Sequence, residues 1–381
     1  MRCRFVHVVV AGLTAALFAC AGEGDRNVSV PSSVSVPSDH RAPYVGPSSD
    51  GALVVHSRLG SPADDQLGPI GPGIVLLGGG PDVDSAFHWM RATIAATRHT
   101  AGDVVVLRAN DDDSLAQHVA DLGVFNSVQT LTLSPKASAD DLDVVAFFLS
   151  RAEGVIIASD DASEFLHWRT TALVAAVQGV FDRGGVVAGV GGGASILGQF
   201  AHDTALASGP VQTSDAIANP FGKSMVFVRD TFRFSQLEGF LVDAHFREND
   251  RFGRLAAFMA RQVSDGTLAS HPPRVFGIGV DQGNALVIDR FSRASLLQAD
   301  GVAGGAYVLT GGAPEQIKPG LPLVYRDIVV ARMDSPGEAY DLDRGCGTAF
   351  VYRVSVQGGD TQRYAPIDPY EAAGVSNDCK Q

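Results

Sequence analysis

The sequence predicts an α/β fold in which a mainly parallel, doubly wound sheet is followed by a β-rich C-terminal extension. Short apolar runs alternate with helical stretches from about residue 73 onward, which is typical of parallel strands covered on both faces. Beyond about residue 300 the apolar runs follow one another without helices between them, which favours antiparallel strands. With 381 residues, 45% of them hydrophobic, the chain can bury a large core.

The first predicted strand covers residues 73–77 and ends in the glycine turn Gly78-Gly79-Gly80. No Lys-Ser or Lys-Thr pair follows this turn and it does not spell a dinucleotide fingerprint, so we interpret it as structural and expect no cofactor. Further strands are predicted at residues 104–107, 128–133, 155–158, 186–190, 274–280, 285–288, 306–310, 327–332 and 349–356. Helices are predicted at residues 85–98, 142–152, 162–182, 194–201 and 252–262.

The strand at residues 186–190 runs into three glycines, Gly191, Gly192 and Gly193. Because glycine accepts positive φ readily, this run indicates a sharp turn from a strand into a helix. In α/β hydrolytic folds such a turn presents a nucleophile above the sheet. Here Gly191 stands at the tip and has no side chain to present.

The formal net charge of −13 argues against nucleic acid as a partner, because nucleic-acid binding requires clustered Lys and Arg. A charged ligand is expected to be basic. The run Asp111-Asp112-Asp113 could bind calcium, but it does not meet the EF-hand pattern, so a solvated loop is the favoured interpretation. We therefore expect no metal site.

The first twenty residues have the layout of a lipoprotein signal peptide: Arg2 and Arg4 precede a mostly apolar run, and a small residue stands before Cys20. We expect a signal peptide at residues 1–19, lipidation of Cys20 and anchoring at the bacterial cell envelope, on the periplasmic face or the cell surface. An ordinary signal peptide or a membrane anchor is the alternative. A flexible Ser/Pro/Gly-rich tether is predicted at residues 20–68, the α/β domain at 69–345 and the extension at 346–381.

Loss of the signal and lipidation would leave Cys346 and Cys379 as the remaining cysteines. In an oxidising compartment this even pair predicts a disulfide that ties the tail to the body of the protein. A metal site is the weaker alternative, since no histidine accompanies the pair at a ligand-like spacing.

Two other stretches could carry chemistry. His245 follows an apolar strand end and precedes several arginines, so it could be a general base beside cations that bind carboxylates, although such a histidine is more often structural. Residues 276–288 predict a tight hairpin with Asp281 and Gln282 at its tip, and turn-forming residues alone would also explain that pattern.

Taken together, the three stretches resemble the cyanophycinase and dipeptidase E group of serine peptidases, peptidase family S51. In that family the elbow reads Gly-Thr-Ser-Ala-Gly-Ala, the histidine motif reads Asp-Gln-His-Phe-x-x-Arg-x-Arg-x-x-Arg-Leu, and the hairpin reads Gly-Ile-Gly-x-Asp-Glu-x-x-Ala. The order and spacing are similar here from about residue 74 to about residue 342. The resemblance implies a class I glutamine amidotransferase-like (flavodoxin-like) sandwich, a serine-peptidase ancestry and a homodimer.

Carried over residue by residue, the resemblance gives His245 the place of the catalytic base. It gives Gly191 the place of the nucleophilic serine, and Gln282 the place of the glutamate that orients the histidine. The sequence Ser159-Asp160-Asp161-Ala162 replaces the Gly-Gly-x-Gln turn of the oxyanion hole. The residues to which the resemblance assigns substrate binding are Asp160, Asp161, Gly192, Arg251 and Arg254.

Without a hydroxyl at residue 191 no acyl-enzyme can form, and the amide of Gln282 cannot stabilise an imidazolium by charge. The leading hypothesis is a lipid-anchored member that has lost hydrolysis and binds a peptide or small molecule at the envelope. The alternative is a working hydrolase of aspartyl or β-aspartyl peptides that uses Ser195 or a water activated by His245. Because Ser195 lies about one helical turn beyond Gly191, we expect it to point away from the reactive position. A third possibility is a structural envelope protein that makes its contacts through residues 346–381.

Overall fold

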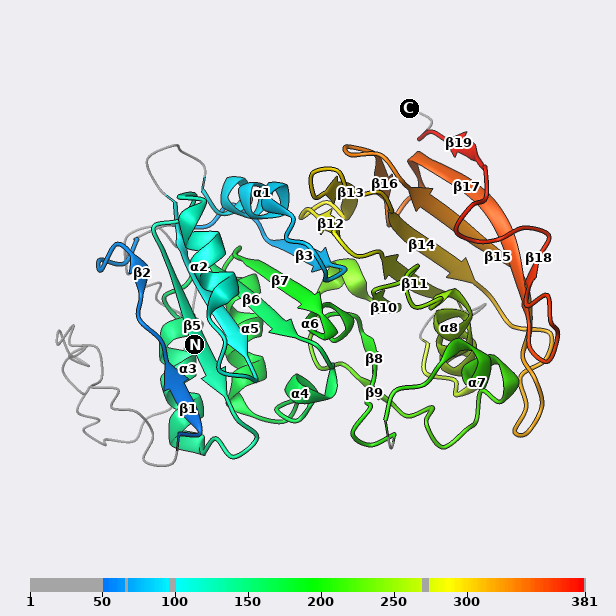
Figure 1. Cartoon of the computed structure of the whole chain (residues 1–381), viewed down its shortest axis with the longest axis horizontal. Helices are drawn as coiled ribbons and strands as arrows, with labels where there is room; N and C mark the ends of the chain where they lie inside the picture. Colours follow the sequence, from blue (N-terminus) through cyan, green and yellow to red (C-terminus); the bar gives the residue numbers. More distant parts are fainter. Residues whose placement is uncertain (1–50, 66–67, 96–100, 208, 269–273, 380–381) are drawn as a thin grey trace, which may run out of the picture. The chain divides into compact units, whose positions relative to one another are not determined.

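Five parallel strands form one half of the sheet (Figure 1). They are β3 (Gly73–Leu77), β4 (Asp103–Arg108), β5 (Ser127–Leu133), β6 (Gly154–Ser159) and β7 (Val186–Gly191). Their pairing gives the order β5-β4-β6-β7-β3. Parallel strands are buried on both faces, which explains why β3, β4, β6 and β7 are nearly continuous apolar runs.

The computed structural model describes residues 51–65, 68–95, 101–207, 209–268 and 274–379. They all belong to one unit, Val45–Gln381. The predicted signal peptide, Cys20 and the predicted tether up to residue 50 lie outside the described residues. Within the described part, no helix combines the length and the apolar composition needed to cross a membrane.

Helices cover both faces of the parallel strands, which confirms the predicted α/β fold. On one face, α1 (Asp84–Ile94) and α2 (Ser114–Asp121) bury their apolar sides against the strands. The opposite face is covered by α3 (Ala139–Leu149), α4 (Ser163–Leu166), α5 (Ala172–Asp182) and α6 (Gly192–Ser195). A capping box formed by Ser138 and Asp141 starts α3 at residue 139 rather than at 142, where it was predicted.

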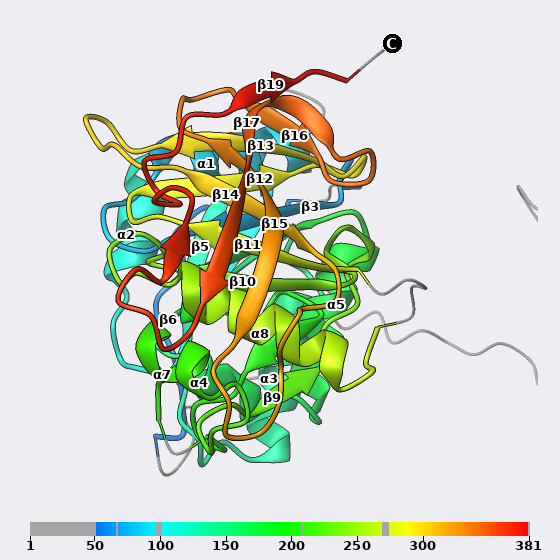
Figure 2. The ribbon, with the colours of Figure 1, turned by 90° about the vertical axis from the view of Figure 1, so that its right-hand side faces the viewer.

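The C-terminal half of the sheet is mainly antiparallel, as the sequence predicts. From β3 the pairing continues through β12 (Asn284–Ile288), β13 (Arg293–Gln298) and β16 (Ala339–Asp341) to β17 (Cys346–Gln357). From β17 it continues through β15 (Val324–Met333), β14 (Ala306–Gly311) and β11 (Val275–Val280) to β10 (Phe240–Ala244). Figure 2 shows the long strands β15 and β17 side by side.

A single long helix, α8 (Phe252–Ser264), packs with the aromatic and aliphatic side chains of one face of these antiparallel strands. Shorter elements complete the described part. They are α7 (Thr213–Ala218), the 3₁₀ turn η1 (Ser235–Leu237), and the strands β8 (Phe200–His202), β9 (Phe227–Arg229), β18 (Tyr364–Ala365) and β19 (Val375–Asn377).

Two helix predictions are wrong. The helix predicted at residues 162–182 is two helices, α4 and α5. The helix predicted at residues 194–201 ends at Ser195, and residues 200–202 form β8, which pairs with β9 and β10. The chain turns here against β10, since a Cβ atom at Gly198 would lie 2.7 Å from the carbonyl oxygen of Phe240.

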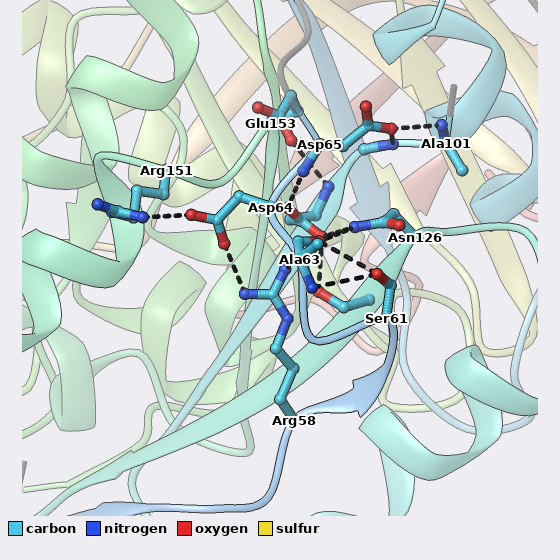
Figure 3. A network of polar contacts seen from close by, with 12 residues as sticks. Arg58, Ser61, Ala63, Asp64, Asp65, Ala101, Asn126, Arg151 and Glu153 are labelled. Atoms are coloured by element: carbon cyan, nitrogen blue, oxygen red, sulfur yellow. Dashed lines mark hydrogen bonds and ion pairs between the residues drawn. The ribbon is translucent and has the colours of Figure 1, made fainter. Parts of the chain in front are cut away.

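Regular structure begins before residue 69. Two short strands, β1 (Leu53–Val55) and β2 (Leu59–Gly60), pair antiparallel with β5. The segment that follows is held by the polar network in Figure 3, in which Arg58 contacts Asp64 at 2.7 Å and Asp64 also pairs with Arg151. Asp65 accepts hydrogen bonds from the backbone N–H groups of residues 101 and 102.

The C-terminal segment is also part of the sheet, because β17 begins at Cys346. The predicted disulfide between Cys346 and Cys379 is confirmed. It ties the first residue of β17 to the segment that follows β19, and β19 itself pairs with β17.

Candidate functional site

The turn after β7 has the backbone conformation that its glycines predict. Gly191 has φ 59° and ψ −118°, and α6 begins at the next residue. A Cβ atom built on Gly191 would lie 3.5 Å from Nε2 of His245 and 2.9 Å from the carbonyl oxygen of Ser159. A side chain at residue 191 would therefore point directly at the histidine ring.

His245 and Gln282 follow neighbouring parallel strands, β10 and β11. The amide Nε2 of Gln282 lies 2.9 Å from Nδ1 of His245. The amide therefore holds the imidazole ring at Nδ1, while the other ring nitrogen, Nε2, faces residue 191. Gln282 therefore makes the contact expected of an orienting residue, but it brings no negative charge.

The glycine turn after β3 packs against this pair. The carbonyl oxygen of Gly78 accepts a hydrogen bond from the backbone N–H of His245 at 3.0 Å. A Cβ atom at Gly79 would lie 2.3 Å from Cε1 of the His245 ring, and one at Gly80 would lie 2.9 Å from Cβ of Gln282. The lack of side chains in this turn makes room for His245 and Gln282.

Three motifs that are far apart in the sequence thus meet at the carboxyl ends of parallel strands. Gly191 follows β7, His245 follows β10 and Gln282 follows β11. In open α/β sheets this edge is where ligands bind. The arrangement therefore has the position of an active site and the relative geometry of a nucleophile, a base and an orienting residue.

Burial lowers the pKa of His245, and the positive charge of Arg251 lowers it further. Carboxylates at Glu248, Asp243 and Asp160 oppose this effect but do not reverse it. The imidazole is consequently neutral at pH 7.

Arg251 and Arg254, which the resemblance assigns to substrate binding, both contact the buried carboxylate of Asp243. Arg254 donates to Asp243 through Nε at 2.9 Å and through Nη2, and Arg251 donates through Nη1 at 3.2 Å. Arg251 also donates to the carbonyl oxygen of Ala244 at 2.6 Å. Both guanidinium groups therefore have a structural partner, and their role in binding a ligand stays a prediction.

Asp160 and Asp161 follow β6, beside the turn that carries Gly191. The carboxylate of Asp161 accepts hydrogen bonds from the hydroxyl of Thr204 and from the backbone N–H of Ser163 at 2.8 Å. Burial alone would raise the pKa of Asp161, but these hydrogen bonds outweigh it and the pKa is lowered. A Cβ atom at Gly192 would lie within 2.8 Å of the Asp161 and Ala162 backbone, so the two turns are in close contact.

The hydroxyl of Ser195 is directed at the backbone of Gly191. It lies 3.5 Å from the carbonyl oxygen of Gly191, one turn back along α6. In the described part of the chain, Ser195 makes no hydrogen bond to His245. A nucleophilic role for Ser195 stays a prediction that this placement does not favour.

Sequence reasoning assigned no role to two buried carboxylates, Asp243 and Asp281. Asp243 holds both arginines, and Asp281 accepts hydrogen bonds from the backbone N–H groups of Arg247 and Gly305 and from the hydroxyl of Tyr307. Burial, with the nearby charge of Glu248, raises the pKa of Asp281 to about 6. Asp243 matches the aspartate of the family's histidine motif, and Asp281 matches that of its hairpin motif. This match is the feature of the sequence from which both residues could have been identified.

Among the described residues, no group of three or more His, Cys, Asp or Glu side chains is arranged to hold a metal ion. In the Asp111-Asp112-Asp113 run, Asp111 contacts His56 at 3.1 Å and Asp112 contacts Arg108 at 3.0 Å. Asp113 accepts a hydrogen bond from the side chain of Gln117 at 2.8 Å.

The chain matches no protein-family model and no curated protein. Among solved structures it is similar to a peptidase from an acI-B1 actinobacterium, with 14% identity, a TM-score of 0.42, and coverage of 72% of this chain and 98% of the other. It is also similar to a provisionally assigned peptidase E protein from Listeria monocytogenes EGD-e, with 11% identity, a TM-score of 0.36, and coverage of 64% and 98%. Both TM-scores are below 0.5, so neither likeness establishes a shared fold.

Proposed function

We propose that the chain is a non-hydrolytic relative of the S51 serine peptidases, with their class I glutamine amidotransferase-like sandwich, and that its former active site binds a ligand. The observation that carries this proposal is the 3.5 Å separation between Nε2 of His245 and a Cβ atom built on Gly191. The histidine is placed to serve a side chain that the sequence no longer has. His245 keeps this position although no nucleophile is present, which supports ligand binding at the site and not substrate turnover.

The chemistry of the two replaced positions supports the same conclusion. Gly191 offers no atom to attack a carbonyl group, so covalent catalysis by the usual route is absent. Gln282 contacts Nδ1 of His245 without a negative charge, so it cannot stabilise the imidazolium that forms when a general base takes up a proton. The first change removes the nucleophile and the second removes the charge that would stabilise an imidazolium, while the backbone framework of the site stays in place.

The ligand of this site is proposed to be a peptide or a similar small molecule with a cationic group. The arginines beside the site are paired with Asp243, whereas Asp160 is exposed and exerts its charge on the His245 ring. A ligand that brings a positive charge would meet this carboxylate with favourable electrostatics.

The decisive experiment restores the missing groups. Gly191→Ser should introduce a hydroxyl beside His245. The double variant Gly191→Ser with Gln282→Glu should react with a fluorophosphonate probe faster than Gly191→Ser alone, by a factor on the order of 10² or more. The glutamate would accept a hydrogen bond from Nδ1–H of His245 and stabilise the imidazolium by its negative charge. Serine at residue 191 should lower the free energy of unfolding by about 1 to 3 kcal/mol, because a non-glycine residue at positive φ is strained. Each variant is therefore first checked for cooperative unfolding.

Gly191→Ala is the matched control, because it adds the Cβ atom without the hydroxyl, and His245→Gln in the restored background should abolish labelling. A folded restored variant that does not label would overturn the proposed site geometry. Labelling or turnover of β-aspartyl dipeptides by the natural sequence, lost on Ser195→Ala or His245→Ala, would instead establish the active-hydrolase alternative.

We further propose that the protein works at the bacterial cell envelope, held to a membrane by lipidation of Cys20. This proposal rests on the charged, apolar and small-residue pattern of residues 1–20. A homodimer is proposed on the family resemblance alone, and the acidic net charge disfavours a nucleic-acid partner.

A further inference from the structure

A hollow of about 560 Å³ lies away from the His245 site, on the face of the sheet formed by β11, β14, β15 and β17. One row of paired residues crosses its floor. Phe276 pairs with Thr310, Thr310 with Val329, and Val329 with Arg353. Since paired residues in neighbouring strands place their side chains on the same face, these four side chains form one continuous strip.

The apolar end of this strip continues the protein core. In the next row, Ile278, Val308 and Ala331 are all at most 2% exposed. In the row of the hollow, Phe276 and Val329 are only partly buried. The Phe276 ring is held by stacking on Phe240, with ring centroids 4.8 Å apart and planes at 22°. The hollow therefore presents a fixed aromatic surface to solvent.

At the polar end of the strip lies the guanidinium group of Arg353, which forms no ion pair with the residues that the structure describes. Arg353 donates through Nη1 to the backbone carbonyl oxygen of Asp327 at 3.1 Å, a contact that leaves its positive charge unneutralised. Within the described residues, Arg353 has no carboxylate partner within salt-bridge distance. Arg274 and Arg344 also line the hollow, together with the carboxylates of Asp327 and Asp343. The hollow thus combines an aromatic floor with a guanidinium group at one end, on a chain of net charge −13.

We propose that this hollow binds a small amphipathic anion, an aromatic carboxylate in chemical class. The carboxylate would bind to the guanidinium of Arg353, whose planar donors match its geometry, and the ring would lie over Phe276 and Val329. The hollow has the volume of a small-molecule site, which is generally about 300 to 1,000 Å³. This site is separate from the His245 site and does not depend on the function proposed for it.

The test uses 1-naphthoate as the probe, titrated into the full mature chain by calorimetry. The natural sequence should bind it saturably with one-to-one stoichiometry, and Arg353→Gln should weaken binding about tenfold or more, because a charge-assisted contact is lost. Arg326→Gln is the matched control, since Arg326 is an exposed arginine of β15 that does not line the hollow, and it should leave binding unchanged.

Two further comparisons distinguish the ionic contact from simple hydrophobic adsorption. 1-Naphthamide, which keeps the ring and lacks the charge, should bind at least about tenfold more weakly than the carboxylate. Thr310→Glu places a like charge in the same row and should also weaken binding, which keeps the test decisive if Arg353→Gln does not fold. No saturable binding, equal binding of the amide, or equal losses in the Arg353 and Arg326 variants would each overturn the proposal.

Discussion

Glu153 is a buried carboxyl group at the start of β6, close to two other carboxyl groups. Its Oε2 accepts a hydrogen bond from the backbone N–H of Asp103 at 2.8 Å. Burial raises the pKa of Glu153 to about 7, and the charges of Asp103 and Asp65 contribute to the increase. Because the folded pKa exceeds the unfolded one, the stability linked to this group is fully present below about pH 4.5 and is lost as the pH rises through about 7.

Glu153→Gln should therefore stabilise the protein at alkaline pH. The amide keeps the volume and an acceptor for the Asp103 N–H while it removes the ionisation, so we expect a gain of about 1 to 2 kcal/mol at pH 8 and little or no gain at pH 5. The measurement is the free energy of unfolding from denaturant titrations at the two pH values.

The matched control is Glu238→Gln, a substitution at an exposed glutamate. In this variant the free energy of unfolding should differ between pH 5 and pH 8 by the same amount as in the natural sequence. An equal effect of Glu153→Gln at pH 5 and pH 8 would mean that the carboxyl group of Glu153 does not titrate in this range.

The positions of site residues could be predicted where they follow from a local sequence motif. The partners of those residues could not be predicted where they depend on tertiary packing. His245, Gly191 and Gln282 could be expected to meet, since each follows a predicted strand within a recognisable motif. The pairing of Arg251 and Arg254 with Asp243 could not be expected, because it depends on how the start of α8 packs beside β10. The contact between Gly79 and the His245 ring also joins segments that are far apart in the sequence.

At the scale of elements, the segment after β17 returns to the loop that carries His245. The hydroxyl of Tyr370 accepts a hydrogen bond from the backbone N–H of Phe252 at 2.9 Å, and that of Tyr364 accepts one from Gly253 at 3.2 Å. Both hydroxyls donate to the carboxylate of Asp250. Two tyrosines thus supply partners for the first N–H groups of α8, which the helix itself cannot satisfy.

Tyr370→Phe should destabilise the protein by about 1 to 3 kcal/mol, because it leaves a buried N–H group of α8 without its partner. If the segment also positions the histidine loop, the same substitution should shift the imidazole resonances and the titration midpoint of His245 in NMR spectra.

Tyr325→Phe provides the matched comparison. This buried tyrosine donates to the carbonyl oxygen of Gly312 at 2.8 Å, in a different segment. It should lower stability by a similar amount while leaving the His245 signals unchanged. Identical NMR effects of the two variants would assign Tyr370 a purely structural role.

The wrong helix prediction at residues 194–201 shows the limit of local periodicity. The segment has few strong helix breakers apart from Gly198, so its pattern favours a helix. In the structure the same segment passes β10 closely and then pairs with it at Phe200. Tertiary contact with a neighbouring strand overrides the local preference.

At the scale of the whole molecule, the proposed anchor predicts where the protein is found. Cys20→Ser should move the chain from the membrane fraction to the soluble fraction of its bacterial host, because the lipid-modified residue is removed. The measurement is immunoblotting of fractionated cells. Cys3→Ser is the matched control, since residue 3 would be lost with the signal peptide, and it should stay membrane-bound. Unchanged membrane association of Cys20→Ser would refute lipidation at this residue.

The extent of the folded unit was harder to predict than its class. Residues 53–60 were assigned to a tether because they lie in a stretch rich in small polar residues, yet they pair with β5. Similarly, the extension predicted from residue 346 begins with β17, which pairs with β15 and β16. Composition does not reveal an edge strand whose partner lies far away in the sequence.

The position of β17 has a consequence for the order in which the protein can be made. Chains emerge from the ribosome amino end first, and early segments can fold before later ones exist. Here β17 joins β16 to β15, so the strand that links the two sides of the antiparallel half of the sheet is among the last parts to be synthesised. The sheet is completed only after nearly the whole chain has emerged, and a nascent chain stalled before residue 346 lacks this connecting strand.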